Sequence, residues 1–205
     1  METVKGFKDF MGEEAEKRAI VTEIIRQTFE KYGFQPVETP IVEYEEFVQG
    51  KNSNDDAVRD IFRLQDRGKR KLALRYEFTF QLKRIAENQK LPFRRYQIGP
   101  NFRDEPIRPG RTRQFTQCDV DVVGSTLKDE AENISMINEI MKTLKIDSIT
   151  YINNRRLMNE ILEEEKIKEK DPIIREIDKL DKLSKVEVKK NLEKYNAGYL
   201  VDLFT

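Results

Sequence analysis

The sequence predicts an α+β fold, in which helices pack on one side of an antiparallel sheet. Stretches with strand-like alternation follow one another directly, as at residues 96–102 and 115–123, so few strand–helix–strand crossovers are possible. Two further short runs flank a turn sequence, which predicts a hairpin. No glycine-rich phosphate loop opens a helix. A doubly wound nucleotide-binding fold is therefore disfavoured, and side chains would have to hold any nucleotide.

Composition narrows the class of protein. The chain has 205 residues, of which 37% are charged, and a formal net charge of +0, so overall charge indicates neither a nucleic acid nor a membrane as partner. There is no histidine and one cysteine, Cys118, which excludes histidine-based triads and disfavours zinc sites and a disulfide framework. No apolar run approaches membrane-spanning length. We therefore expect a cytoplasmic protein with no metal site of its own.

The first elements follow from apolar spacing and from proline. Residues 12–32 predict an amphipathic helix that stops at Gly33. Residues 34–42 are expected to be extended. Pro36 and Pro40 break this stretch, and Pro40 donates no N–H to a ladder, so this strand is expected at the edge or end of a sheet.

Short strands and helices alternate in the middle of the chain. Residues 61–65 and 71–74 are expected to pair around the turn Asp66-Arg67-Gly68-Lys69, with Gly68 supplying a positive φ. The other expected elements are a helical turn at 43–47, a loop at 50–57, helices at 80–88 and 129–144, and a strand at 149–153.

The last quarter of the chain has a different character. Residues 155–205 are rich in Lys and Glu and predict three or four short helices, with apolar positions such as Ile173 and Ile177 on one stripe. Pro172 is expected at the first position of one of these helices. We therefore expect two domains, residues 1–154 and a small helical module over 155–205, whose charge run is interpreted as a solvated face.

The candidate site lies between residues 96 and 124. Prolines and a glycine keep the connection between its two strands irregular. This loop carries the guanidinium groups of Arg103, Arg108, Arg111 and Arg113. One face of the second strand presents Phe115, Gln117, Asp119 and Asp121, and the other turns Cys118 towards the core. Such a face beside arginines suits a polyphosphate next to a polar, cationic small molecule.

Each of these residues also has a plainer interpretation. The arginines could form a basic surface loop, an alternative that is stronger for Arg108 and Arg113 than for the other two. Phe115 taken alone could pack in the core. Asp119 and Asp121 could lie on a solvated strand face.

Four segments in consistent order resemble the N-terminal part of histidyl-tRNA synthetases, a family of class II aminoacyl-tRNA synthetases. KGFKDF at 5–10 is similar to the opening Arg-Gly-x-x-Asp-Phe of that family. YGFQPVETPIVE resembles class II motif 1, with its proline at Pro40. LRYEFT resembles the segment Leu-Arg-Pro-Glu-x-Thr, with Tyr76 in place of the proline. FRDE at 102–105 and RTRQF at 111–115 resemble motif 2.

The resemblance implies an ATP site. Arg103 would be the catalytic residue, holding the α-phosphate of ATP and the amino-acid carboxylate and stabilising the charge that grows on phosphorus. Glu105 would accept from the adenine amino group, and Phe115 would stack on the adenine. Arg111 would reach the γ-phosphate.

The resemblance also implies a histidine site. Glu77, Thr79 and Gln117 would contact the α-amino group and backbone end of histidine. Asp121 would accept from an imidazole N–H, at a position where the family often has the longer Glu. The alternative for Glu77 is an ion pair with Arg75.

The implied function is histidine–tRNA ligase activity. L-histidine, ATP with Mg²⁺, and tRNA(His) would be its partners, with Arg108 in the motif 2 loop facing the tRNA and motif 1 forming a homodimer. The family's segment Arg-Gly-x-x-Tyr-Tyr and its motif 3 are not found, and residues 155–205 resemble the start of its helical insertion. The chain is therefore expected to hold half of the activation site and to be inactive or very weak alone.

Two other functions stay open. One is a non-catalytic paralogue that senses histidine, like the regulatory subunit of ATP phosphoribosyltransferase, although such a regulator need not keep ATP-handling arginines. The other is a class II synthetase for glycine, threonine or proline.

Overall fold

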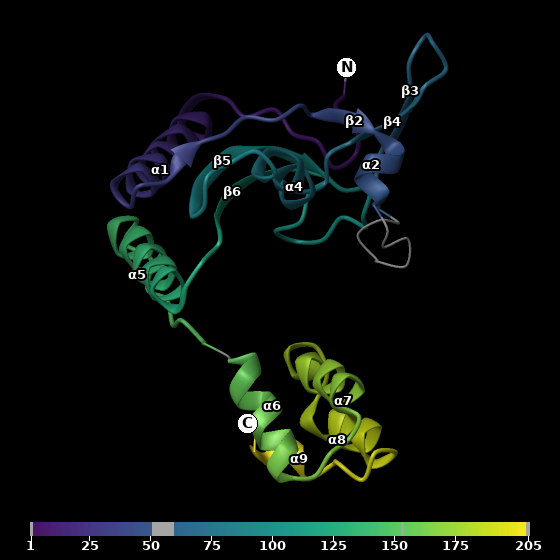
Figure 1. Cartoon of the computed structure of the whole chain (residues 1–205). Helices are drawn as coiled ribbons and strands as arrows, with labels where there is room; N and C mark the ends of the chain where they lie inside the picture. Colours follow the sequence, from purple (N-terminus) through teal and green to yellow (C-terminus); the bar gives the residue numbers. More distant parts are fainter. Residues whose placement is uncertain (1, 51–59, 153, 204–205) are drawn as a thin grey trace. The chain divides into compact units, whose positions relative to one another are not determined.

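The computed structural model describes residues 2–50, 60–152 and 154–203, and the chain divides into two compact units, residues 1–149 and 150–205 (Figure 1). The first unit contains both sheets and the candidate site. The second unit is helical. Within the described residues, no helix combines the length and the apolar composition needed to cross a membrane.

A three-stranded sheet forms the centre of the first unit. It consists of β1 (Gln35–Pro36), β5 (Phe93–Phe102) and β6 (Gln114–Val123), in the order β1-β5-β6. β5 and β6 run antiparallel over ten residues each, whereas β1 pairs with β5 in parallel. The short strand in this stretch thus lies at a sheet edge, as predicted, whereas Pro40 itself lies outside the strands.

A second three-stranded sheet lies beside β5. It is antiparallel, in the order β2-β4-β3, and consists of β2 (Val42–Tyr44), β4 (Lys71–Leu74) and β3 (Arg63–Gln65). The backbone N–H of Phe102 donates to the carbonyl of Arg75 at 3.0 Å, which joins the residue after β4 to the end of β5. The predicted α+β class is confirmed, with the antiparallel pairing split between two sheets and one parallel pair at an edge.

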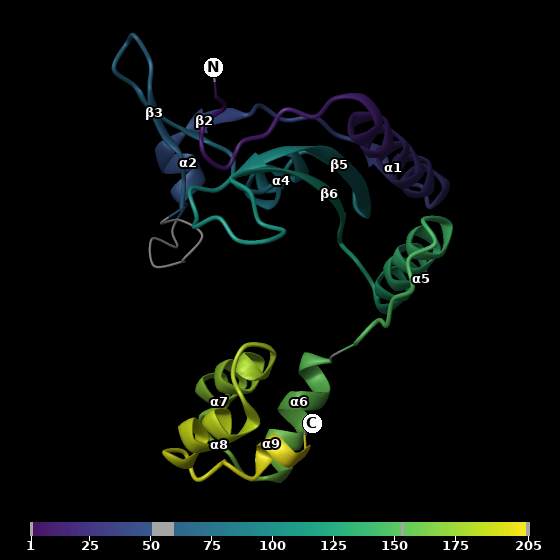
Figure 2. The same ribbon diagram turned by 180° about the vertical axis from the view of Figure 1, so that it is seen from behind.

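Two long helices cover one face of the β5–β6 hairpin. They are α1 (Gly12–Lys31) and α5 (Leu127–Thr143), and they contact each other (Figures 1 and 2). The core between the helices and the hairpin is made by Phe29, Phe34, Tyr96, Met136 and Ile140. The stop expected at Gly33 is confirmed: its φ is +78° and its N–H donates to the carbonyl of Glu30.

Two shorter helices flank the second sheet. They are α2 (Glu45–Gln49) and α4 (Thr79–Ala86). The prediction of a helical turn from Glu43 was wrong at its start, because Glu43 belongs to β2 and the helix begins two residues later. The loop expected over 50–57 lies outside the described residues, except for Gly50.

The β3–β4 turn differs from its prediction. Lys69, not Gly68, has the positive φ, at +60°. The carboxylate of Asp66 accepts from the backbone N–H of Arg70 at 2.9 Å and from its Nε at 2.6 Å. These bonds close the turn and favour the left-handed conformation at the residue between them.

The strand expected at 149–153 was also wrong over its described part. Residues 149–152 form no strand, and residue 153 lies outside the described residues. The side chains of Ile149, Tyr151 and Ile152 are exposed, so within the described residues these β-branched and aromatic side chains have no sheet to pack against.

The second unit is a small bundle of helices. Its elements are α6 (Arg155–Glu164), α7 (Lys170–Ile177), the 3₁₀ helix η1 (Asp178–Asp181), α8 (Lys185–Glu193) and α9 (Leu200–Leu203). The predicted apolar stripe is confirmed, since Ile173, Ile174 and Ile177 are buried in its core. Pro172 is the third residue of α7 rather than the first, which the first turn also tolerates.

Candidate active site

The two faces of the β5–β6 hairpin have opposite characters. Cys118, Val120 and Val122 pack against the core under α1 and α5, and burial raises the pKa of the Cys118 thiol. This agrees with the predicted core role of Cys118. The other face pairs Arg95 with Asp121, Gln97 with Asp119, Gly99 with Gln117, and Asn101 with Phe115 across the strands. We call this second surface the polar face.

Arg103 and Phe115 lie together at the end of the polar face. The guanidinium carbon of Arg103 is 5.1 Å from the centre of the Phe115 ring. Nε of Arg103 donates to the carbonyl oxygen of Tyr76 at 3.2 Å, which brings the residue before Glu77 next to the same arginine. Both Arg103 and Phe115 are half-buried, so a planar ligand has access to them.

Glu105 and Arg111 face each other across the loop. Nη1 of Arg111 donates to the Glu105 carboxylate at 3.2 Å, and their side chains are 62% and 20% exposed. Nη2 of Arg113 lies 3.0 Å from the Asp104 carboxylate in a second cross-loop pair. Arg108 is exposed and pairs with Arg111 through the backbone alone. The sequence-predicted phosphate ligands thus occupy one loop that ion pairs hold closed.

The N-terminal segment docks onto the base of this loop. The backbone N–H of Arg113 donates to the carbonyl of Gly6 at 2.9 Å, and Phe7 stacks on Phe102. Gly6 has a φ of +89°, and a Cβ added there would lie 2.7 Å from Cγ of Arg113. Both constraints require glycine at this position.

The candidate histidine ligands come from three elements. Gln117 of β6 accepts from Nδ2 of the fully buried Asn101 at 2.7 Å, which fixes its amide. Asp121 is ion-paired with Arg95 of β5. Glu77 is half-buried in the segment before α4, and Thr79 is exposed as the first residue of that helix.

Asp121 has an unusual electrostatic setting. Burial raises the pKa of its carboxyl group above the ordinary value, the nearby Arg95 opposes that rise, and Asp119 adds to it. The net pKa is raised, so Asp121 takes up a proton more readily than an exposed aspartate.

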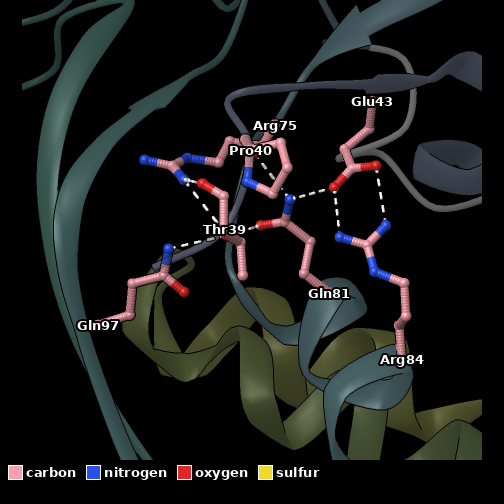
Figure 3. Close-up of polar contacts among 7 residues, drawn as sticks. All are labelled: Thr39, Pro40, Glu43, Arg75, Gln81, Arg84 and Gln97. Carbon is pink, nitrogen blue, oxygen red and sulfur yellow. Dashed lines mark hydrogen bonds and ion pairs between the residues drawn. The ribbon is translucent and has the colours of Figure 1, made fainter. Parts of the chain in front are cut away.

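A buried polar network supports the site from the side of β4 (Figure 3). Nη1 of Arg75 donates to the backbone oxygen of Thr39 at 2.7 Å, and its Nε donates to that of Pro100 at 3.0 Å. The hydroxyl of Thr39 also contacts the Gln97 amide at 2.8 Å. Gly99 makes room for this arginine, because an added Cβ would lie 3.0 Å from its Nη2. The network thereby joins the segment after β1 to the polar face.

The second half of the network centres on Glu43. Its carboxylate accepts from Nε2 of Gln81 at 2.6 Å and from both terminal nitrogens of Arg84, at 2.9 and 2.7 Å. Gln81 also donates to the carbonyl of Pro40 at 2.8 Å. These contacts fasten α4 to the segment that follows Pro40.

Sequence reasoning missed Arg95, Asn101 and the part of this network formed by Glu43, Gln81 and Arg84. The alternation of β5 contained a signal for the first two, because residues 95, 97, 99 and 101 share one face of a strand that pairs with 115–121. The Glu43 contacts join residues about forty positions apart, and no local pattern indicates them.

Metal ligands do not gather in this part of the chain. Over the described residues, no group of three or more Cys, Asp or Glu side chains is arranged to hold a metal ion.

Comparison with known proteins matches residues 6–201 to the histidyl-tRNA synthetase family model. The chain is 41% identical to histidine–tRNA ligase 1 of Bacillus cereus, over 94% of this chain and 46% of that protein. It is 39% identical to the histidine–tRNA ligase of Wolinella succinogenes, over 93% and 44%. The chain thus spans about half the length of the curated relatives it matches.

The fold agrees with this comparison. The structure matches the crystal structure of histidyl-tRNA synthetase from Nostoc with a TM-score of 0.80 and 32% identity, over 95% of this chain and 45% of that one. A structure from Bacillus halodurans described as an ATP phosphoribosyltransferase regulatory subunit/histidyl-tRNA synthetase matches with a TM-score of 0.60 at 23% identity, over 69% and 37%, which indicates a shared fold alone.

Proposed function

The chain belongs to the histidyl-tRNA synthetase family, and we propose that its polar face and motif 2 loop contribute to the site that activates histidine with ATP. In that reaction a carboxylate oxygen of histidine attacks the α-phosphorus of ATP. The new phosphorus–oxygen bond forms as the bond to pyrophosphate breaks, giving histidyl-adenylate. No protein nucleophile and no general base is required, so the chain's contribution is position and charge.

The pairing of Arg103 with Phe115 is the observation that carries this proposal. An adenine stacked on Phe115 would place its phosphates near a guanidinium whose carbon lies 5.1 Å from the ring. The hydrogen bond from Nε to Tyr76 fixes one edge of Arg103 and leaves the other for an oxyanion. As the phosphorus becomes five-coordinate, a fixed positive charge there stabilises the transition state more than the ground state.

The Glu105–Arg111 pair is expected to open when ATP binds. Arg111 would turn to the γ-phosphate, and the Glu105 carboxylate would accept from the adenine amino group. Arg111 is 62% exposed, and breaking such an exposed ion pair costs only about 0–1 kcal/mol. A charge-assisted bond to phosphate would offset that cost.

Histidine would lie along the polar face. Gln117, held by Asn101, would accept from the α-amino group together with Glu77, and Thr79 would add a contact at the same end of the substrate. Asp121 would face the imidazole. The carboxylates of Asp119 and Asp121 are half-buried, and partial burial of a charge is unfavourable unless it has polar partners. A polar ligand would supply a further partner.

Further partners follow from the family. We expect Mg²⁺ to arrive with ATP and tRNA(His) to meet the motif 2 loop through the exposed Arg108. Homodimerisation would use the segment after Pro40, where the side chains of Ile41, Val42 and Tyr44 are exposed. A cytoplasmic location completes the proposal.

Two measurements test it. Titration calorimetry should show that ATP binds to this chain and that Arg103→Ala weakens binding at least about tenfold, as expected for the loss of a charge-assisted hydrogen bond. Pyrophosphate exchange by this chain alone is expected to be absent or very weak, and a panel of amino acids then tests which substrate supports any exchange that is detected. ATP binding that is unchanged in Arg103→Ala, or exchange supported better by glycine, threonine or proline, would contradict the proposal.

The second candidate function is that of a non-catalytic paralogue that senses histidine. It would bind histidine on the same polar face without using Arg103 or Arg111. The structure offers no observation that favours it over the ligase.

A further inference from the structure

Arg95 is a deeply buried charge beneath the polar face. Its side chain is 1% exposed, and it lies directly across the strands from Asp121. Nη2 donates to Oδ2 of Asp119 at 3.0 Å and to Oδ2 of Asp121. Nε and Nη1 are buried and have no partner among the described residues. Burying a guanidinium with two unpartnered nitrogens costs free energy, and the two bonds from Nη2 do not fully offset that cost. Stability alone therefore does not explain Arg95, which indicates a functional role.

We propose that Arg95 is a positioning residue, which holds Asp119 and Asp121 side by side so that both carboxylates face the imidazole ring of histidine. This inference rests on the proposed function and names how the substrate side chain is recognised. It also makes Asp119 a second acceptor, a role that the family resemblance does not assign to it.

The depth of the three side chains supports this arrangement. The side chains of Asp119 and Asp121 are 23% and 30% exposed, whereas that of Arg95 is 1% exposed. The carboxylates therefore lie between the guanidinium and the open side of the polar face. In each aspartate Oδ2 accepts from Arg95, and Oδ1 has no hydrogen-bond partner within the described chain. Two acceptor atoms thus remain for the N–H groups of one ligand.

The charges of the three groups also fit an imidazole. Two carboxylates and one guanidinium leave a net charge of −1, which suits a ring that carries one N–H when neutral and two when protonated. Asp121 is one methylene shorter than the glutamate frequent in the family. Arg95 fixes the Asp121 carboxylate, and Asp119, two residues away on the same face, supplies a second acceptor. Together these two features compensate for the shorter side chain of Asp121.

Without Arg95 the two aspartates would repel each other in a partly desolvated place. Burial and Asp119 raise the pKa of Asp121, and only Arg95 opposes them. A protonated Asp121 would lose acceptor capacity towards the ring. Arg95 therefore favours the ionised form of Asp121 and also fixes the position of its carboxylate.

The test measures two independent properties of this chain by NMR. The first is the pKa of Asp121, followed through its carboxyl carbon without any ligand. The second is the preference for histidine over 3-(2-thienyl)alanine, whose ring has a similar shape and no N–H. The variants are Arg95→Met, Arg95→Lys and Asp119→Asn. Arg94→Met is the matched control, because Arg94 precedes Arg95 on the opposite face, where it pairs with Asp129 and Glu132.

Removing Arg95 and removing the charge of Asp119 should shift the pKa of Asp121 in opposite directions. Arg95→Met should raise the pKa of Asp121 by about one unit or more, and Asp119→Asn should lower it, because each removes one neighbouring charge. Arg95→Met should reduce the preference for histidine at least about tenfold while thienylalanine binding stays unchanged, since the α-amino contacts remain. Arg95→Lys should fall between, and the control should match wild type.

Several outcomes would overturn the inference. One is an unchanged Asp121 pKa in Arg95→Lys and Arg95→Met; if the methionine variant does not fold, the lysine variant and Asp119→Asn decide. Another is an unchanged preference for histidine in folded variants. If wild type binds neither ligand, the proposed function and the imidazole role both fail, and the pKa values separately decide whether Arg95 holds the aspartates.

Discussion

Replacing Glu43 tests whether the buried network holds the site together. Glu43→Ala removes three hydrogen bonds, one from Gln81 and two from Arg84. Their energies will not simply add. Gln81 keeps its bond to the Pro40 carbonyl, and the Arg84 side chain is 44% exposed and can return to water. We therefore expect a loss of about 2–4 kcal/mol, below or at the lower end of the range for breaking a fully buried pair.

The pH dependence of this loss has a definite sign. Burial alone would raise the pKa of Glu43, but the bonds from Arg84 and Gln81 outweigh it, and the net pKa lies below the ordinary value of 4.5. A carboxylate with a lowered pKa stabilises the fold fully above its unfolded-state pKa. That contribution disappears as the pH falls through the folded-state value. The difference between wild type and Glu43→Ala should therefore be constant from pH 6 to 8 and shrink below about pH 4.5.

Amide hydrogen exchange is the appropriate assay, because the chain has two units and one melting curve would mix them. Protection of amides in α4 should fall in Glu43→Ala, while protection in α8 of the other unit stays constant. The matched control is Glu13→Gln, which breaks an exposed pair with Lys17 and should cost less than about 0.5 kcal/mol. A loss in Glu43→Ala no larger than that of the control would refute the reasoning.

Three further predictions concern the site itself. Arg103→Lys should keep the charge but lose the planar fork, and should weaken ATP binding several-fold in calorimetry; full affinity would contradict the assigned role. Gly6→Ala should lower the opening free energy measured by amide exchange in the first unit by about 1–3 kcal/mol, because it adds both a strained φ and a clash with Arg113, whereas Gly12→Ala (φ +55°, open space) isolates the φ cost. If Gly6→Ala costs no more than Gly12→Ala, the docking of the N-terminal segment is not as tight as described. Arg108→Ala should weaken tRNA(His) binding and reduce the slope of log K against log salt by about 0.7–0.9, and an unchanged slope would remove Arg108 from the tRNA surface.

The sequence was informative where structure is local. Alternation in residues 115–123 separated the polar face from the core face and placed Cys118 correctly, because strand geometry fixes that period. The helix stop at Gly33 and the edge position of the strand that precedes Pro40 followed from the backbone chemistry of glycine and proline. Arg103 and Phe115 came from motif spacing, and the structure brings them together.

Other features depend on contacts that the sequence does not encode locally. Lys69, and not Gly68, has the positive φ in the β3–β4 turn, because the hydrogen bond from the Arg70 N–H to the Asp66 carboxylate closes the turn at that residue. This bond outweighs the usual preference for glycine at a positive φ. Residues 149–152 have strand-like composition but no neighbouring strand to pair with among the described residues. Sequence reasoning did not single out Arg95, and it is the strand register that places it opposite Asp121.

Mapping ATP and histidine onto the amide spectrum of this chain tests the central claim most directly. ATP should shift the resonances of Arg103, Glu105, Arg111 and Phe115, and histidine should shift those of Glu77, Gln117 and Asp121, with the helical unit unaffected. That result would place both ligands on the polar face and its loop. Shifts confined to residues 154–203, or none at ten times the concentration at which a full-length relative saturates, would contradict the account.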